Sequence, residues 1–354
     1  MKKRHLALVA AFLATTIYGI NHTIAKEVMP IYIGSFGFIM LRLLGATALF
    51  WIISFFTPKE KVERKDFITI FFAAIFGVCV NMLAFFRGLE LSTPINSGVI
   101  ITLVPVIVLI LSYLFLKERI TFLKVSGILI GFSGALFLIF NSSKTGINAP
   151  NIPVGNSLFL LNASAYAGYL VIIKPLAKKY NVFTLMKWTF LFGLILSTPL
   201  TYNQFSAVEW NTLPWFAIWR MAYVVIGTTF LTYLLNIYAL KTLSPTTVGS
   251  FIYLQPIITI IFALMIGSDF LDFTKVLACL FLVTSTGFGI VGAVFFDKSE
   301  FGLGWSCYLV SITMILFVPF LFRGLNTEKS RKLGRISVNL PLFITLILFS
   351  IIVM

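Results

Sequence analysis

Two apolar segments of this chain, residues 94–124 and 245–275, carry the same order of prolines, glycines and charged residues. A constant offset of 151 relates them, pairing Pro94 with Pro245, Gly98 with Gly249, Leu103 with Leu254, Pro105 with Pro256, Glu118 with Asp269, Phe122 with Phe273 and Lys124 with Lys275. Apolar segments interrupted by proline and glycine at matching places in two halves of a chain are typical of membrane transporters built from repeats. The chain is therefore expected to fold as two related halves within a bilayer.

The composition agrees with a membrane protein. Hydrophobic residues make up 59% of the chain and charged residues 11%, whereas a soluble domain has about a quarter charged residues. The first apolar run follows three basic residues but lacks a clear cleavage site, so we expect a retained span and not a signal peptide. Ten runs reach the roughly 20 residues that cross a bilayer: 6–25, 31–56, 67–86, 94–116, 123–141, 153–173, 182–201, 213–236, 245–267 and 274–296.

Lysine and arginine predict the orientation of these spans. With the N-terminus in the cytoplasm, sixteen basic residues of loops and span ends fall inside and four outside, which is a clear positive-inside bias. Five spans per half is an odd number, so the second half is inverted relative to the first. We therefore expect an all-α membrane protein, a polytopic bundle of ten core transmembrane helices in two inverted five-helix repeats. Because the net charge of +15 lies in short groups between apolar runs, it does not indicate a nucleic-acid partner.

The C-terminal residues fit this scheme less well. Two more apolar runs, 301–322 and 338–354, enclose a loop that holds Arg323, Lys329, Arg331, Lys332 and Arg335. If both runs cross, this basic loop lies outside, against the positive-inside rule. Either 301–322 does not cross fully or the pair inserts against the rule, and both alternatives stay open. We treat 297–354 as an accessory hydrophobic tail.

The motifs of the two halves resemble a known family. Residues 87–119 read R-G-L-E-L-S-T-P-I-N-S-G-V-I-I-T-L-V-P-V-I-V-L-I-L-S-Y-L-F-L-K-E-R, and residues 238–256 read Y-A-L-K-T-L-S-P-T-T-V-G-S-F-I-Y-L-Q-P. This pattern is similar to the EamA branch of the drug/metabolite transporter superfamily, with Ser268-Asp269 where that family usually has Gly-Glu. The resemblance implies one repeat over 1–141, a second, inverted one over 153–296, and a carrier with a central cavity and alternating access.

Catalytic chemistry has little support in the sequence. All twelve acidic residues fall in loops or at span ends, which argues against a carboxylate-driven proton antiporter of the small multidrug type and against a membrane metalloenzyme. No Ser-His-Asp or H-E-x-x-H arrangement is visible, and the three cysteines suggest neither a disulfide framework nor a metal cluster. We expect no enzyme, no cofactor and no metal site.

Polar side chains recur at helical spacing within several apolar runs. Because polar side chains facing lipid are costly, these stripes are expected to face the bundle interior and to line a substrate cavity. Hydrogen bonding between helices is the alternative, and His22 in particular can be a satisfied polar residue instead of a relay. The candidate cavity residues are Tyr18, Asn21, His22, Asn81, Asn162, Tyr166, Tyr169, Thr232 with Tyr233 as its alternative, Asn236 and Tyr253, and Phe85 shares the face of Asn81.

One charge and two prolines stand out in the middle of spans. Arg42 is the only charge near a span centre, and it either anchors an anionic group or is satisfied by helix-end carbonyls and polar neighbours. Pro105 and Pro256 are expected to kink their helices and to free the carbonyls of Ile101 and Ile252, with gating as the functional interpretation and packing as the alternative.

These observations predict an alternating-access carrier in the cytoplasmic membrane. Its substrate is expected to be a small polar metabolite, such as an amino acid or a related organic solute, with export as one direction. The alternatives are a nucleotide-sugar or sugar-phosphate exchanger, which needs several cations in its cavity, and a non-transporting scaffold or sensor. The expected partners are the small-molecule substrate and the lipid bilayer, without nucleic acid, and a homodimer stays open.

Overall fold

The computed structural model describes residues 2–117, 129, 133 and 149–266, and all regular structure in that part of the chain is helical. Seven of its helices are long and apolar enough to cross a membrane: Lys3–Val28, Ser35–Ser54, Arg64–Leu91, Asn96–Leu116, Ile152–Lys179, Val182–Ser206 and Trp215–Thr242. They correspond to seven of the predicted spans, and Pro245–Ile266 is helical where the ninth was expected. The predicted spans 123–141 and 274–296 and the tail runs lie outside the described residues.

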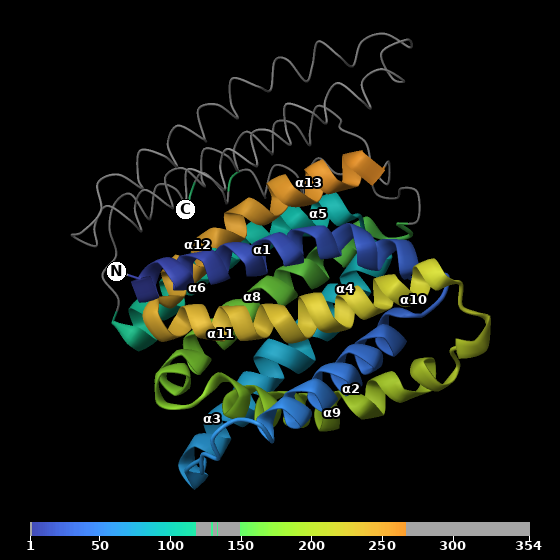
Figure 1. Cartoon of the computed structure of the whole chain (residues 1–354). Helices are drawn as coiled ribbons and strands as arrows, with labels where there is room; N and C mark the ends of the chain where they lie inside the picture. Colours follow the sequence, from blue (N-terminus) through green and yellow to red (C-terminus); the bar gives the residue numbers. More distant parts are fainter. Residues whose placement is uncertain (1, 118–128, 130–132, 134–148, 267–354) are drawn as a thin grey trace.

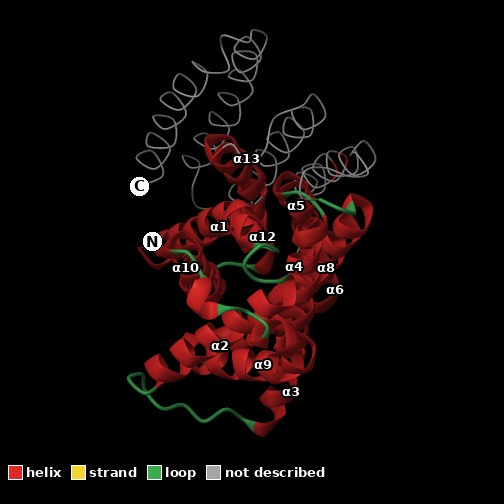
Figure 2. Cartoon of the chain, turned by 90° about the vertical axis from the view of Figure 1, so that its right-hand side faces the viewer, coloured by secondary structure: helices red, strands yellow, loops and turns green. Residues whose placement is uncertain are grey.

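The helices pair across the two halves of the sequence. Helix α2 (Ser35–Ser54) packs along α9 (Val182–Ser206), α4 (Asn81–Leu91) along α8 (Ile152–Lys179), and α1 (Lys2–Val28) along α11 (Thr232–Thr242) (Figure 1). The turned view shows α2 and α9 together in the lower part of the bundle, next to α3 (Arg64–Ala74) (Figure 2). In terms of spans, the second meets the seventh, the third the sixth, and the first the eighth. In the described part of the chain, the helices of each half therefore pack mainly against those of the other half.

Glycines allow α4 and α8 to approach closely. A Cβ atom on Gly155 of α8 would lie 2.8 Å from the carbonyl oxygen of Gly88 in α4. A side chain at either position would push the helices apart, because small residues are what lets two backbones approach in a membrane bundle.

Four irregular segments interrupt the spans at matching places. A π-helix at Ile75–Val80 joins α3 (Arg64–Ala74) to α4, and a second one at Tyr223–Leu231 joins α10 (Trp215–Ala222) to α11. Shifting the first by 151 places it on residues 226–231, inside the second. The two halves thus share the irregularity of the third span of each repeat, and π-helices of this kind often mark functional sites.

The two 3-10 helices within the spans also occupy matching places in the two repeats. Ile101–Leu103 separates α5 (Pro94–Ile100) from α6 (Val104–Leu116), and Phe251–Leu254 separates α12 (Pro245–Ser250) from α13 (Gln255–Ile266). Pro105 and Pro256 are therefore the second residues of new α-helical segments and do not kink a continuous helix. The prediction of a free carbonyl at Ile101 is wrong, because the N–H of Val104 donates to it within the tighter 3-10 turn.

Two lysines cap equivalent helix ends. Lys26 of α1 donates from Nζ to the carbonyls of Leu89 (2.6 Å) and Ser92 (2.9 Å) at the end of α4, and also to that of Glu90. Lys174 of α8 donates to the carbonyls of Leu240 and Leu243 at the end of α11. Leu240 and Leu243 are Leu89 and Ser92 shifted by 151, so the first helix of each repeat caps the third helix of the same repeat. The lysines thereby satisfy carbonyls that a helix end leaves without intrahelical partners.

Polar contacts tie the loops together at both ends of the bundle. At one end, Lys179 pairs with Glu63 and with Asp66 (2.7 Å), and the N–H of Asn181 donates to Glu60. At the other end, the side chain of Gln204 accepts a hydrogen bond from the N–H of Phe36 (2.9 Å), and Arg220 pairs with Glu27 (2.7 Å). These contacts agree with spans that alternate in direction, because they join only loops predicted to lie on the same face.

Candidate functional site

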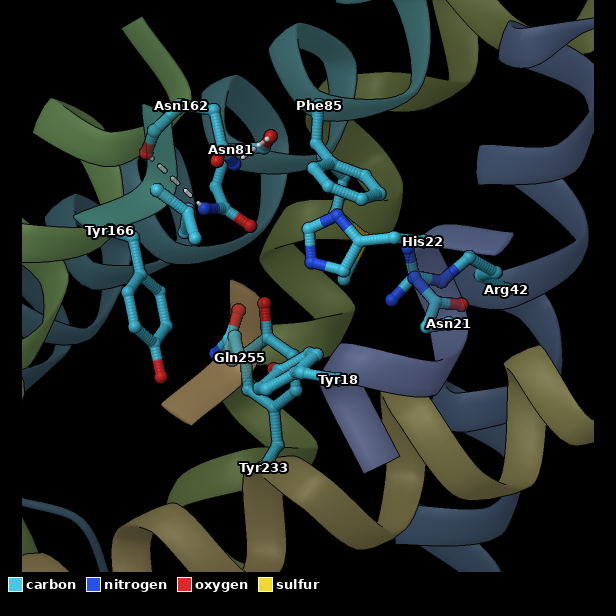
Figure 3. A pocket seen from close by; sticks show the side chains of 12 residues that line it. Tyr18, Asn21, His22, Arg42, Asn81, Phe85, Asn162, Tyr166, Tyr233 and Gln255 are labelled. Atoms are coloured by element: carbon cyan, nitrogen blue, oxygen red, sulfur yellow. Dashed lines mark hydrogen bonds between the residues drawn. The ribbon is translucent and has the colours of Figure 1, made fainter. Parts of the chain in front are cut away.

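A polar cavity lies between the two halves of the bundle (Figure 3). Its walls come from α1, α2, α4 and the first 3-10 helix on one side and from α8, α11 and α13 on the other. Its volume is about 50 Å³, which is room for a few waters. The lining residues are Tyr18, Asn21, His22, Arg42, Asn81, Met82, Phe85, Ile101, Asn162, Tyr166, Tyr233 and Gln255.

The structure brings most of the sequence candidates to this one cavity. Arg42, suggested as a buried charge, lines it, as does Phe85, which shares the face of Asn81, and so does Tyr233, which was the alternative to Thr232. The prediction for the Tyr253 side chain lies outside what the structure describes. Six residues predicted to line a cavity do so: Tyr18, Asn21, His22, Asn81, Asn162 and Tyr166.

Three candidates lie one layer behind the lining. Asn236 donates from Nδ2 to the hydroxyl of Tyr166 at 2.9 Å and so holds that lining ring in place. The fully buried ring of Tyr169 packs between Tyr166 and Tyr233, with centroids 6.0 and 5.9 Å away. Thr232 donates its hydroxyl to the carbonyl of Thr228, in the π-helix that precedes α11. These residues support the cavity wall instead of forming its surface.

An amide pair joins the repeats at the cavity wall. The Asn162 side chain donates to the carbonyl of Asn81 (2.9 Å), and the Asn81 side chain donates to the carbonyl of Asn162 (3.5 Å). Asn81 is the first residue after a π-helix. The interior of that π-helix is also held from the second repeat, because the Tyr233 hydroxyl donates to the carbonyl of Gly77 at 2.5 Å. The irregular segment is therefore fixed by side chains of the opposite half.

His22 has a defined hydrogen-bond partner. Its Nδ1 lies 2.5 Å from the hydroxyl of Ser97, and that hydroxyl donates to the carbonyl of Pro94 at 2.8 Å. Since the bond to Pro94 uses the single proton of the hydroxyl, the Ser97 oxygen accepts from Nδ1 in this arrangement. The ring also meets Phe85 edge-on, 5.2 Å between centroids. His22 is thus a held polar residue of the wall, as the simpler interpretation of the sequence expected.

Among the described residues that line the cavity, Arg42 alone carries a fixed charge. Its Nε donates to the hydroxyl of Thr229 at 2.6 Å, and its guanidinium carbon lies 4.5 Å from the centre of the Phe86 ring. The residue is 4% exposed. Its partners are thus a neutral hydroxyl and an aromatic face, and neither neutralises the charge.

Sequence reasoning missed Met82 and Gln255. Gln255 carried a signal, because it is a lone amide in an apolar run, directly before Pro256. Met82 carried none, since an apolar side chain beside Asn81 looks like any lipid-facing or core residue.

Comparison with known proteins places this architecture among transporters. The uncharacterized transporter YyaM of Bacillus subtilis is 25% identical over 68% of this chain and 81% of its own length. An uncharacterized transporter of Archaeoglobus fulgidus is 29% identical over 72% of this chain and 86% of its own. A WAT1-related protein of Arabidopsis thaliana is 26% identical over 81% of this chain and 76% of its own.

A solved crystal structure shares the fold. It superposes with a TM-score of 0.64 at 16% sequence identity and covers 82% of this chain and 99% of its own. The EamA-like transporter family matches this chain twice, at residues 5–140 and 153–291. The two matches, together with the apolar helices of the described part, make this a multi-pass membrane protein. The chain belongs to the EamA-like transporter family.

Proposed function

We propose that the protein moves a small polar metabolite, such as an amino acid or a related organic solute, across the cytoplasmic membrane by alternating access. The observation that carries this proposal is a polar cavity whose wall comes from both repeats. A site shared by two halves is reshaped when one half moves relative to the other, which is how repeat-built carriers expose a fixed site to either side. We propose that the N-terminus is cytoplasmic and that export is the direction to test first.

The structure offers parts for such a movement. Interrupted helices flank the cavity in both repeats, and each interruption supplies a place where a span can bend. Polar contacts close the bundle at both ends, through Lys179 with Asp66 and through Arg220 with Glu27. In the proposed cycle one of these contacts opens while the other stays closed. A carrier of this kind needs no catalytic group, and we propose no enzymatic activity.

A binding screen followed by flux measurement tests the proposal. A metabolite at 100 times its dissociation constant stabilises the folded protein by about 2.7 kcal/mol, which a thermal-shift assay on purified protein detects. Ligands found in this way are then assayed for saturable counterflow in proteoliposomes. Absence of saturable flux for every ligand would favour a scaffold or sensor.

Two variants assign the flux to the cavity. Asn236→Ala removes the donor that holds Tyr166, and Tyr166→Ala removes the ring, so both should reduce counterflow at near-normal membrane abundance. Leu161→Ala, on the exposed face of the same helix as Tyr166, is the matched control and should transport normally. Wild-type flux in both cavity variants would move the site elsewhere.

A further inference from the structure

The charge of Arg42 lacks a balancing charge in the cavity. None of the twelve lining residues is Asp or Glu, and Arg42 itself is 4% exposed in the middle of a membrane-spanning helix. Removing a charge from water is expensive unless an opposite charge or several hydrogen bonds replace the solvent. A hydroxyl and the face of a phenyl ring replace little of it. The site is therefore electrostatically incomplete, and an anion completes it.

The two terminal nitrogens of the Arg42 guanidinium remain available as hydrogen-bond donors. Thr229 occupies Nε and Phe86 covers one face, while the terminal nitrogens donate no hydrogen bond to any described residue. An arginine presents its donors as a planar fork that matches the two oxygens of a carboxylate. Figure 3 shows Arg42 and Asn21 approaching the cavity from one side, and Asn162 and Tyr166 from the other. A carboxylate bound by Arg42 would thus place the rest of its molecule toward Asn162.

Two buried amide oxygens indicate which other groups the ligand carries. Oδ1 of Asn21 and Oδ1 of Asn162 are buried and accept no hydrogen bond from the described residues, and both side chains are at most 3% exposed. Buried acceptors without a donor are costly and uncommon. Both residues line the cavity, but these oxygens are enclosed, so a ligand reaches them only when the two side chains turn toward it. A ligand that carries a hydroxyl or N–H group beside its carboxylate would then satisfy them, whereas a plain aliphatic acid would not.

The charged and polar residues that line the cavity disfavour ligands of other net charge. A cationic amine would meet Arg42 without any lining carboxylate to offset the repulsion. A phosphate dianion would bring about two charges to a single cation, where phosphate sites commonly gather several donors and cations. This inference rests on the proposed carrier but narrows its substrate from amino-acid zwitterions to anionic organic solutes. We infer that the cavity selects small carboxylates of net charge −1 that also carry a hydroxyl or amide donor, with Arg42 as the specificity-determining residue.

Binding of charge-matched probes tests this inference on the purified full chain. Lactate (−1), lactamide (0), alanine (zwitterion) and alaninamide (+1) share one skeleton, and phenyllactate with its three counterparts supplies a larger one. In at least one series the hydroxy acid should bind about 10-fold to 100-fold more tightly than its amide, the ratio expected for a charge-assisted pair. The inference is overturned if neither hydroxy acid shifts the thermal midpoint, or if the cation, the zwitterion or inorganic phosphate shifts it as much.

Variants tie the preference to Arg42. Arg42→Gln should lose the preference for the acid over the amide, and Arg42→Lys should keep part of it. Arg87→Gln removes a half-exposed arginine that pairs with Glu90, and it should leave the preference intact. If Arg42→Gln does not fold, Thr229→Val provides the second variant, because loss of the Nε partner should weaken acid binding and leave amide binding unchanged. An acid preference that survives in Arg42→Gln, or in Thr229→Val where the first variant fails, overturns the inference.

The outcome separates this inference from the proposed function. If neutral or cationic solutes show counterflow and their binding does not depend on Arg42, the proposed carrier function stands and the proposed anion site is rejected. If hydroxy acids bind in a way that depends on Arg42 but are not transported, the proposed anion site stands and the proposed carrier function is rejected. The apo protein adds an independent readout, since Arg42→Gln removes an unbalanced buried charge and should raise the thermal midpoint without ligand. A lower midpoint in an Arg42→Gln protein that still folds would show that Thr229 and Phe86 already offset the charge, and would overturn the premise of the inference.

Discussion

Asn81 and Asn162 each donate a side-chain hydrogen bond to the other's backbone carbonyl. The pair thereby joins the third span of the first repeat to the first span of the second repeat. The shorter bond, from Asn162, is 2.9 Å long and reaches the residue that follows a π-helix. Such a pair fixes the register of two helices, because sliding either one breaks both bonds. It also lies in the cavity wall, so register and site geometry are set by the same two side chains.

The first prediction concerns this pair. Asn162→Leu should lower the free energy of unfolding by about 1–3 kcal/mol, because a buried carbonyl loses its donor. It should also reduce flux, since the wall of the cavity loses a polar group. Thermal unfolding and counterflow of the same preparation measure both effects. Leu161→Ala is the control on the exposed face, and equal stability of the two variants would contradict the prediction.

The second prediction concerns the capping lysines. Lys26→Met and Lys174→Met should each destabilise the fold by about 1.5–3 kcal/mol, because helix-end carbonyls lose charge-assisted hydrogen bonds. The two effects should be similar, as the lysines occupy equivalent places in the repeats. Lys178→Met, at an exposed position of the same helix as Lys174, should behave like the wild type. A large effect of only one of the two caps would show that the halves are not energetically equivalent.

The third prediction concerns pH. Hydrogen bonds from Lys179 and Lys65 lower the pKa of the half-exposed Glu63 carboxyl group. Its stabilising contribution is therefore complete above the pKa of the unfolded chain, about 4.3, and is lost as the pH falls through the lower folded-state value. Glu63→Gln should make the thermal midpoint less dependent on pH below about 5. Glu209→Gln, in an exposed loop at the other end, serves as the control. Identical acid dependence in the wild type and Glu63→Gln would refute this role.

The fourth prediction concerns orientation, and its basis is the sixteen-to-four distribution of basic residues. In a variant without Cys79, Cys279 and Cys307, a cysteine at position 60 should be shielded from an impermeant thiol reagent in intact cells. A cysteine at position 211 should react, because Glu60 and Asn211 are exposed in loops at opposite ends of the bundle. The reverse labelling would invert the topology.

The fifth prediction concerns residues 297–354, which the structure does not describe. A chain that ends at Lys298 should insert, stay monodisperse in detergent and retain flux, because both family matches are complete by residue 291. Size-exclusion chromatography and counterflow test this. Folded but inactive truncated protein would make the tail part of the mechanism.

The sequence predicted the bundle well because each span is specified locally. An apolar run of sufficient length has one stable solution in lipid, a helix, and the breaks at Pro94 and Pro245 begin helices in the structure. Polar candidates converged on one cavity because residues such as Tyr18 and Asn162 have no favourable place at the lipid surface. These inferences need no knowledge of which helices touch.

The layer behind the cavity could not be predicted in the same way. Helical spacing placed Thr232 and Asn236 on the lining, but a π-helix with i→i+5 bonds precedes them, so side chains on either side of it do not keep the 3.6-residue period. The partner of Arg42, Thr229, lies 187 residues away in the chain. Such a contact follows from the way the halves pack, which the local pattern does not contain.

The pairing of α1 with α11, α2 with α9 and α4 with α8 has a consequence for the covalent chain. Each pair unites one helix from either repeat, so the linker between the repeats contributes little to holding them together. A chain cut within that linker is expected to yield two polypeptides that assemble when made together, while neither fragment folds alone. By the same logic, a single ancestral repeat able to insert in both directions could have built this bundle as an antiparallel pair of identical subunits.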